Sequence, residues 1–132
     1  MTDHIFPDAQ AAAIEAVRTA VGGSVASRIP PNPADGHLRV WRSGGSVRDV
    51  AHDVAVITYQ AWSPDEARAS LRAREAQQAL HDLRNTETSH GWITFRDDIA
   101  APVHLPHPDR DGFIYQGSVA VIARIIERNS RG

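Results

Sequence analysis

Two histidines and two aspartates late in the chain are the residues whose type and spacing best suit metal binding. His104 and His107 lie three residues apart, and Asp109 and Asp111 follow. Imidazole and carboxylate groups are common zinc ligands, but a rigid helix or strand usually fixes their geometry. The segment around them is rich in proline, so we expect a solvated loop and no metal site. Residues 109–112 also lack the further ligands that a calcium loop requires.

Other kinds of reaction chemistry are restricted by the residues that the chain lacks. Its 132 residues include no cysteine and no lysine, and all 14 basic residues are arginine. Thiolate nucleophiles, disulfides, Schiff-base lysines and P-loop lysines are therefore excluded. No G-x-S-x-G or G-x-G-x-x-G motif is present. We predict a non-enzymatic protein without catalytic residues or cofactors. The alternative is a small α+β enzyme, or a metal- or ligand-binding module, that uses His104 and His107.

Length and charge set further limits on the class of protein. A chain of 132 residues with 42% hydrophobic residues corresponds to one globular domain, residues 1–132. The net charge is -2, so the sequence has no basic stripe typical of a nucleic-acid-binding protein. No apolar run approaches the roughly 20 residues of a membrane-spanning helix. We expect no membrane partner, and a cytoplasmic location unless an assembly carries the chain elsewhere.

The elements that must position these residues follow from the apolar periodicity. The pattern predicts an α+β, sandwich-like fold in which a mixed, mostly antiparallel sheet of four or five strands packs against two helices. Asp3 or Thr2 is expected to cap the first helix, and Ser63-Pro64 to start the second. The predicted helices are residues 7–21 and 64–84, the strands 38–43, 53–62, 92–96 and 113–126, the loops 24–36, 44–51 and 97–112, and a disordered tail 129–132.

The last predicted strand is longer than a compact body of this size. Fourteen residues span roughly 46 Å, whereas a compact 132-residue domain is about 36 Å across. Two outcomes fit. The run bends or breaks at Gly117, or one end leaves the body and offers unpaired backbone to another chain.

A second feature that suits contact between subunits is the pair of arginines around a tryptophan. Arg39 and Arg42 flank Trp41 on a short strand that leads into Gly44-Gly45. Arginine and aromatic residues are enriched at the energetic centres of protein interfaces. An interface and a merely exposed sheet edge both remain possible from the sequence.

Four segments together resemble one protein family. They are Arg28-Ile29-Pro30-Pro31, residues 37–45, the strand 53–62 with the following Ser63-Pro64-Asp65-Glu66-Ala67, and residues 113–119. With the order of the elements, they resemble the tail terminator (tail completion) proteins of long-tailed bacteriophages and prophages, over about residues 25–126. Residues 46–50 and 102–108 depart from that pattern.

The resemblance implies a structural role in a virion. Such proteins form a ring, usually of six copies, on the head-proximal end of the tail tube, stop its polymerisation and offer a docking face to the neck. The implied partners are other copies of the chain, the tail tube protein and a head-completion or neck protein, with DNA only passing through the lumen. The implied location is the virion tail, and the host cytoplasm during assembly. Another neck or head–tail joining protein is the alternative. The residues expected at a subunit or tube contact are Arg39, Trp41, Arg42, Ser43, Gly44, Gly45, Val47 and Arg48.

Overall fold

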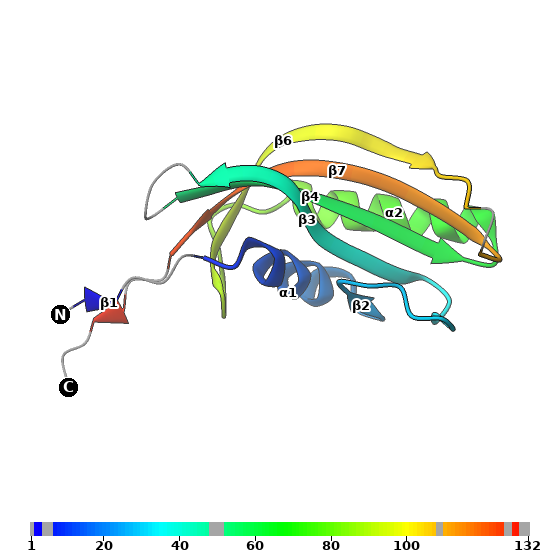
Figure 1. Cartoon of the computed structure of the whole chain (residues 1–132), viewed down its shortest axis with the longest axis horizontal. Coiled ribbons are helices and arrows are strands. Elements are labelled where there is room, and N and C mark those ends of the chain that lie inside the picture. The colour runs from blue at the N-terminus through cyan, green and yellow to red at the C-terminus, as the bar shows by residue number, and fades with distance from the viewer. Residues whose placement is uncertain (1, 4–6, 48–51, 108–109, 126–127, 130–132) are drawn as a thin grey trace.

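A six-stranded sheet and two helices form the body of the molecule (Figure 1). The computed structural model describes residues 2–3, 7–47, 52–107, 110–125 and 128–129. The elements in chain order are β1 (Thr2–Asp3), α1 (Ala9–Val21), β2 (Val25–Ala26), β3 (His37–Val47), β4 (His52–Ser63), α2 (Glu66–His81), β5 (Thr86–Thr88), β6 (Gly91–His104), β7 (Phe113–Arg124) and β8 (Arg128–Asn129). The large sheet has the order β2-β3-β4-β7-β6-β5. Its neighbouring strands are antiparallel, except for the parallel pair β2 and β3.

The α+β class and the mixed, mostly antiparallel sheet agree with the prediction, but the predicted number of four or five strands is wrong. The two strands that the sequence did not indicate are β2 and β5, which contain two and three residues. β2 lies in a proline-rich stretch predicted as a loop, and β5 lies in a turn-rich stretch. Strands this short carry no periodic pattern, and pairing with β3 and β6 alone defines them.

β4 and β7 form the centre of the sheet. They pair along their whole length, from His52 opposite Arg124 to Ser63 opposite Phe113, without a register shift. β6 pairs with the other margin of β7. The predicted break at Gly117 and the predicted projecting end are therefore wrong for residues 113–124, and residue 126 of the predicted strand lies outside the described residues. The compact-sphere estimate failed because the long strands lie along the long axis of an elongated body (Figure 1).

The β-bulges lie in β6, whereas the sequence predicts a bend or break in the strand that became β7. Residues 92–104 lie opposite residues 115–124, so thirteen residues face ten, and three register shifts absorb the difference. The prediction of a strand at 92–96 followed by a loop was wrong because these bulges interrupt the alternation of apolar and polar residues. β5 pairs only with residues 91–93. Among the described residues, no strand covers the outer margin of β6 beyond them.

Both helices begin after an aspartate. The Asp8 side chain accepts a hydrogen bond from the Ala11 N–H at 2.9 Å, and Asp65 accepts one from the Arg68 N–H at 3.2 Å. These caps replace the predicted Asp3 or Thr2 and Ser63. Residues at helical spacing form the buried face of α2, because Ala69, Ala73, Ala76 and Leu80 are all fully buried. Such small side chains allow α2 to lie close to the sheet.

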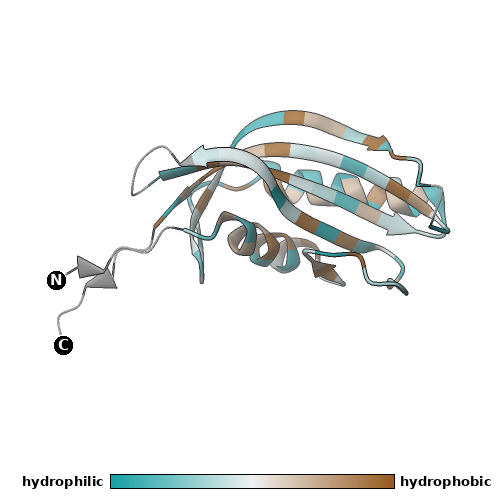
Figure 2. Ribbon diagram, in the orientation of Figure 1, coloured by the Kyte–Doolittle hydropathy of each residue, from teal (hydrophilic) through white to brown (hydrophobic). Residues whose placement is uncertain are grey.

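The two faces of the sheet differ in what covers them. α1 and α2 pack on one face, where the core contains alternate residues of the strands, and the bands of hydropathy in Figure 2 follow this alternation. We call this the helix-covered face and the opposite side the helix-free face. On the helix-free face, Thr58 and Gln60 of β4 are still 4% and 8% exposed. Polar groups are therefore buried on the side that no described helix covers.

The two ends of the chain lie together. β1 and β8 pair antiparallel, with Thr2 opposite Asn129 (Figure 1). The disorder predicted for residues 129–132 is therefore wrong for Asn129, and the rest of that tail lies outside the described residues. Neither described helix has the length and apolar character needed to span a bilayer.

Candidate interaction surface

β3 carries most of the residues predicted at an interface, and a β-bulge divides it. The register with β4 shifts between Arg42 and Gly44, so Ser43 is an extra residue. Gly45 has a φ of +104°, and a Cβ there would overlap the Val54 carbonyl oxygen. Glycine is required because the two strands approach closely at this point. The predicted loop from Gly44 therefore does not begin there, and β3 continues through the bulge to Val47.

Arg42 is directed to the helix-covered face and is bound within its own chain. Its guanidinium forms a two-pronged ion pair with Asp53, in which Nη1 contacts Oδ2 and Nη2 donates to Oδ1 at 2.7 Å. Its Nε also donates to the Gly44 carbonyl oxygen at 3.0 Å. Asp53 is 3% exposed, and a buried carboxylate needs a cation beside it. Arg42 therefore fixes the bulge and has little guanidinium left for a partner.

Arg39 and Trp41 lie on the helix-free face, as the alternation along the strand predicts. The Arg39 guanidinium carbon is 3.7 Å from the centre of the Trp41 ring, which is a cation–π geometry. Arg39 also donates from Nε to the Ser27 carbonyl oxygen at 3.1 Å. Both side chains are half-buried. The aromatic ring and the charge thus form one preorganised unit on the surface.

A row of polar side chains crosses the helix-free face next to Trp41. The Thr58 hydroxyl is hydrogen-bonded to the Ser43 hydroxyl at 2.6 Å and to the Ser118 hydroxyl at 2.9 Å. Gln60 donates to the Gln116 side-chain oxygen at 2.7 Å. The row joins β3, β4 and β7 and carries no formal charge. It gives this face a polar but neutral centre.

The structure therefore separates the predicted contact residues. Arg39, Trp41 and Ser43 gather on the helix-free face, whereas Arg42 is committed to Asp53 and the two glycines shape the bulge. Val47 pairs with Asp53 through the backbone. Arg48 lies outside the described residues.

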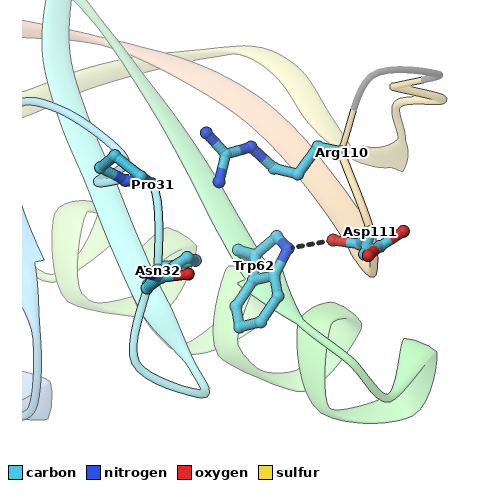
Figure 3. Close-up of a pocket in the computed structure, with 6 residues that line it drawn as sticks. Pro31, Asn32, Trp62, Arg110 and Asp111 are labelled. Carbon is cyan, nitrogen blue, oxygen red and sulfur yellow. Dashed lines mark hydrogen bonds between the residues drawn. The ribbon is translucent and has the colours of Figure 1, made fainter.

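A hollow of about 520 Å³ lies at the far end of β4 (Figure 3). Its walls include Pro31, Asn32, Trp62, Arg110 and Asp111. Trp62 donates from Nε1 to the Asp111 carbonyl oxygen at 2.7 Å. In Figure 3 the Arg110 guanidinium extends toward Pro31, and the Asp111 carboxylate points away from it. A hydrogen bond agrees with this orientation of the guanidinium, since Arg110 Nη1 donates to the Pro30 carbonyl oxygen at 3.2 Å.

A second hollow of about 410 Å³ adjoins the first through Arg110, and we call it the arginine pocket. Three arginines line it, Arg28, Arg39 and Arg110, together with Ile29, Gln60, His107 and Ile114. None of its described lining residues is a carboxylate, and the described ion pairs include none of the three arginines. The sequence did not indicate this cluster, because its arginines come from three separate segments that only the fold brings together.

His37 positions the wall of the arginine pocket that carries Arg28. Its buried ring contacts the Arg28 carbonyl oxygen from Nε2 at 2.6 Å and the Ser24 hydroxyl from Nδ1 at 2.6 Å. A carbonyl only accepts, so Nε2 must carry the proton and donate. Together with the bond from Arg39 to Ser27, this contact holds the segment after β2 against β3.

The two histidines considered for a metal site have separate surroundings. His104 lies at the end of β6, where its ring centre is 5.9 Å from that of Phe113 and 5.6 Å from that of Tyr115. His107 lines the arginine pocket. Asp109 lies outside the described residues. Among those described, no three histidine, aspartate or glutamate side chains gather as metal ligands would.

Tyr59 is a fully buried side chain of the core with a polar atom that is unpaired within the described part of the chain. It lies opposite Gly117, and its hydroxyl has no hydrogen-bond partner among the described residues. Burial raises the pKa of the Tyr59 hydroxyl above its ordinary value, and the charge of Asp98 raises it further. The phenol is therefore neutral at physiological pH.

Comparison with known proteins reveals a shared fold without a shared sequence family. No protein-family model matches the chain, and no curated protein matches it. Among solved structures, a chain of the "Virion of native gene transfer agent (GTA) particle" has a similar fold, with a TM-score of 0.54 and 18% sequence identity. The likeness covers 91% of this chain and 95% of that chain. At this identity the comparison shows the fold alone.

Proposed function

We propose that this protein is a structural component of a phage-like particle, and that within the particle it is the tail terminator. The observation that carries the proposal is the fold likeness to a chain of a gene transfer agent virion over nearly the whole length of both chains. The resemblance of four segments to phage tail terminators supports the finer role. In this role, copies of the chain form a ring that caps the tail tube and presents a docking face to the neck.

The surface of the molecule suits a protein that acts by contact. The helix-free face has a neutral polar centre, and Trp41 with its stacked Arg39 lies beside it. Aromatic and arginine side chains of this kind often supply much of the energy of an interface. We assign Trp41 to the contact with the tail tube. The role needs no reaction chemistry, and the protein is proposed to act without catalysis.

A tube-capping assay tests the proposal. The purified chain is mixed with polymerising tail-tube protein, and tube lengths are measured by electron microscopy. Capping predicts short tubes whose length no longer increases when tube protein is added. Tubes that continue to grow at saturating concentrations of the chain would exclude the terminator role.

A matched pair of variants tests the assigned contact. Trp41→Ala is expected to weaken capping at least about tenfold, as loss of an interface anchor does. Trp92→Ala is the control, since Trp92 is also half-buried on the helix-free face and has an arginine 5.8 Å from its ring centre. Equal losses in both variants would remove the assignment to Trp41.

The second candidate within the same class is another head–tail joining component. The same virion comparison favours it equally, because that structure is of a whole particle. Binding measurements with isolated tubes and isolated head portals separate the two. A terminator binds the tube end, whereas a head-side joining protein binds the portal and leaves tube growth unchanged.

A further inference from the structure

The arginine pocket has positive charge that nothing in the described part of its own chain neutralises. Arg39 and Arg110 each donate one hydrogen bond to a backbone carbonyl. The Arg28 side chain makes no hydrogen bond among the described residues. Since a guanidinium has five N–H donors, most of the donors around the pocket remain available. The adjacent Asp111 carboxylate points away from the Arg110 guanidinium (Figure 3). The pocket therefore suits an acidic group supplied from outside.

A segment of opposite character lies on β6. Residues 97–99 read Asp-Asp-Ile, and all three are exposed on the strand margin that no described strand covers. Ile99 is 56% exposed, which is unusual for a large apolar side chain. Asp98 lies 3.6 Å from His81, whereas the described ion pairs give Asp97 no partner. We call residues 97–99 the acidic edge segment.

The two features match in chemistry. The pocket combines guanidinium groups with an apolar wall from Ile29 and Ile114, and the segment combines carboxylates with an exposed isoleucine. Within one copy they cannot meet. Asp97 pairs with Ala120, and Ile114 lies six residues further along β7, about 20 Å away. Each copy thus exposes both halves of a complementary contact at separate places.

We propose that the arginine pocket of one copy receives the acidic edge segment of a second copy. Because the two surfaces differ, the contact is heterologous, and repeated rotation from copy to copy can close it into a ring. The inference rests on the proposed function, which supplies the ring. It adds which two surfaces join neighbouring copies in that ring. Nucleic acid is a less suitable occupant, since its phosphates need a basic stripe and these arginines gather in one pocket.

A charge exchange tests the contact. Arg28→Glu and Asp97→Arg each alter a side chain with no described interaction of its own, so the fold is expected to persist. Each is expected to weaken self-association about tenfold, because like charges then face one another. The double variant restores opposite charges and is expected to return within about threefold of the original affinity. Arg74→Glu and Glu87→Arg, both at exposed positions, serve as controls. Failure of the double variant to recover would overturn the proposal.

Cross-linking separates this contact from the ring itself. The chain has no cysteine, so the double variant His107→Cys with Arg96→Cys carries two thiols. The thiol at position 107 lies at the arginine pocket, and the thiol at position 96 lies next to the acidic edge segment. A short bis-maleimide is expected to produce a ladder of covalent multimers, whereas Arg74→Cys with Glu87→Cys yields monomers. Rings in native mass spectrometry without a ladder would reject the contact and keep the ring. Monomers throughout would reject both. A ladder without tube capping would keep the contact and reject the terminator role.

The competing occupant has its own readout. Binding of a duplex DNA oligonucleotide is measured by fluorescence anisotropy for the unaltered chain and for Arg28→Glu. The proposal predicts that the substitution changes self-association and leaves the anisotropy measured with DNA unaltered. A loss of DNA binding with unchanged self-association would instead assign the pocket to phosphate groups and overturn the proposal.

Discussion

The two faces of the sheet treat polar side chains in different ways. On the helix-covered face, Asp53 is buried and held by Arg42 in a two-pronged pair that fixes the bulge in β3. On the helix-free face, neutral hydroxyl and amide groups bond to one another, and the arginines around the pocket face no described carboxylate. The same residue type therefore serves the fold on one face and is available for a partner on the other. Arg42 differs from the pocket arginines in having a carboxylate within reach.

Removing the buried carboxylate should have the largest effect on stability. Asp53→Ala leaves the Arg42 guanidinium without its counter-charge, and we expect the free energy of unfolding to fall by about 3 kcal/mol. Urea denaturation measures this change. Glu75→Ala is the control, because Glu75 is 45% exposed in its side chain and lies 3.9 Å from Arg72, so its loss should cost below about 1 kcal/mol. Equal effects would show that burial does not distinguish the two ion pairs.

A methyl group at Gly117 should have the next largest effect. Its Cβ would overlap the Tyr59 hydroxyl and lie 3.0 Å from the Ala100 carbonyl oxygen. We expect Gly117→Ala to lower the free energy of unfolding by about 2 kcal/mol, since the crowded core must shift. Gly44→Ala is the matched control, because a Cβ there meets nothing nearer than 3.9 Å.

Tyr59 supplies a rescue for the same site. Tyr59→Phe removes a buried hydroxyl that has no described partner, so it should raise the free energy of unfolding by about 1 kcal/mol. Combined with Gly117→Ala, it should recover part of the loss, and a double-mutant cycle measures that coupling. Strict additivity would show that the hydroxyl and the added methyl group do not collide.

Substitutions on the helix-free face should lower the free energy of unfolding less than those on the helix-covered face. Thr58→Val keeps the shape of the side chain and removes its hydrogen bonds to Ser43 and Ser118. We expect a loss of about 1 kcal/mol, because both serines are accessible enough to bond to water instead. Thr94→Val should cost less, since the Thr94 hydroxyl makes a single bond of 3.3 Å to the Leu83 carbonyl oxygen. A loss for Thr58→Val as large as that for Asp53→Ala would abolish the contrast between the faces.

The fold was predictable wherever one segment carries its own signal. The buried alanines of α2 follow from their spacing, and so does the placing of Arg39 and Arg42 on opposite faces of β3. The bulges were not predictable, because a bulge breaks the alternation by which a strand is recognised. The pair Gly44-Gly45 predicts the start of a loop, although the close approach of β4 is what requires Gly45.

The candidate surfaces were less predictable than the fold. The unit of Arg39 and Trp41 could be predicted because its members are neighbours on one strand. The arginine pocket forms because the fold brings Arg28, Arg39 and Arg110 together from three segments. No local sequence pattern indicates that these residues are close in space. In the same way, the sequence did not show that Asp53 would engage Arg42, since only the register of β3 with β4 brings the two together.

The smallest expected effect concerns a carboxylate at the surface, which sharpens the contrast with Asp53. Hydrogen bonds from Ser89 hold the pKa of the Glu15 carboxyl below its ordinary value, and the Ser89 N–H donates at 2.8 Å. Because the folded-state pKa is the lower one, Glu15 stabilises the fold above its ordinary pKa, and this contribution is lost as the pH falls through the folded-state value. Glu15→Gln should therefore reduce stability at neutral pH by less than about 1 kcal/mol, since the half-buried side chain still reaches water, which screens its charge. Thermal melting across the acid range should show the two proteins converging as the pH falls. A gap that persists at the acid end would mean that the side-chain shape of Glu15, rather than its charge, secures the contact between α1 and the turn before β6.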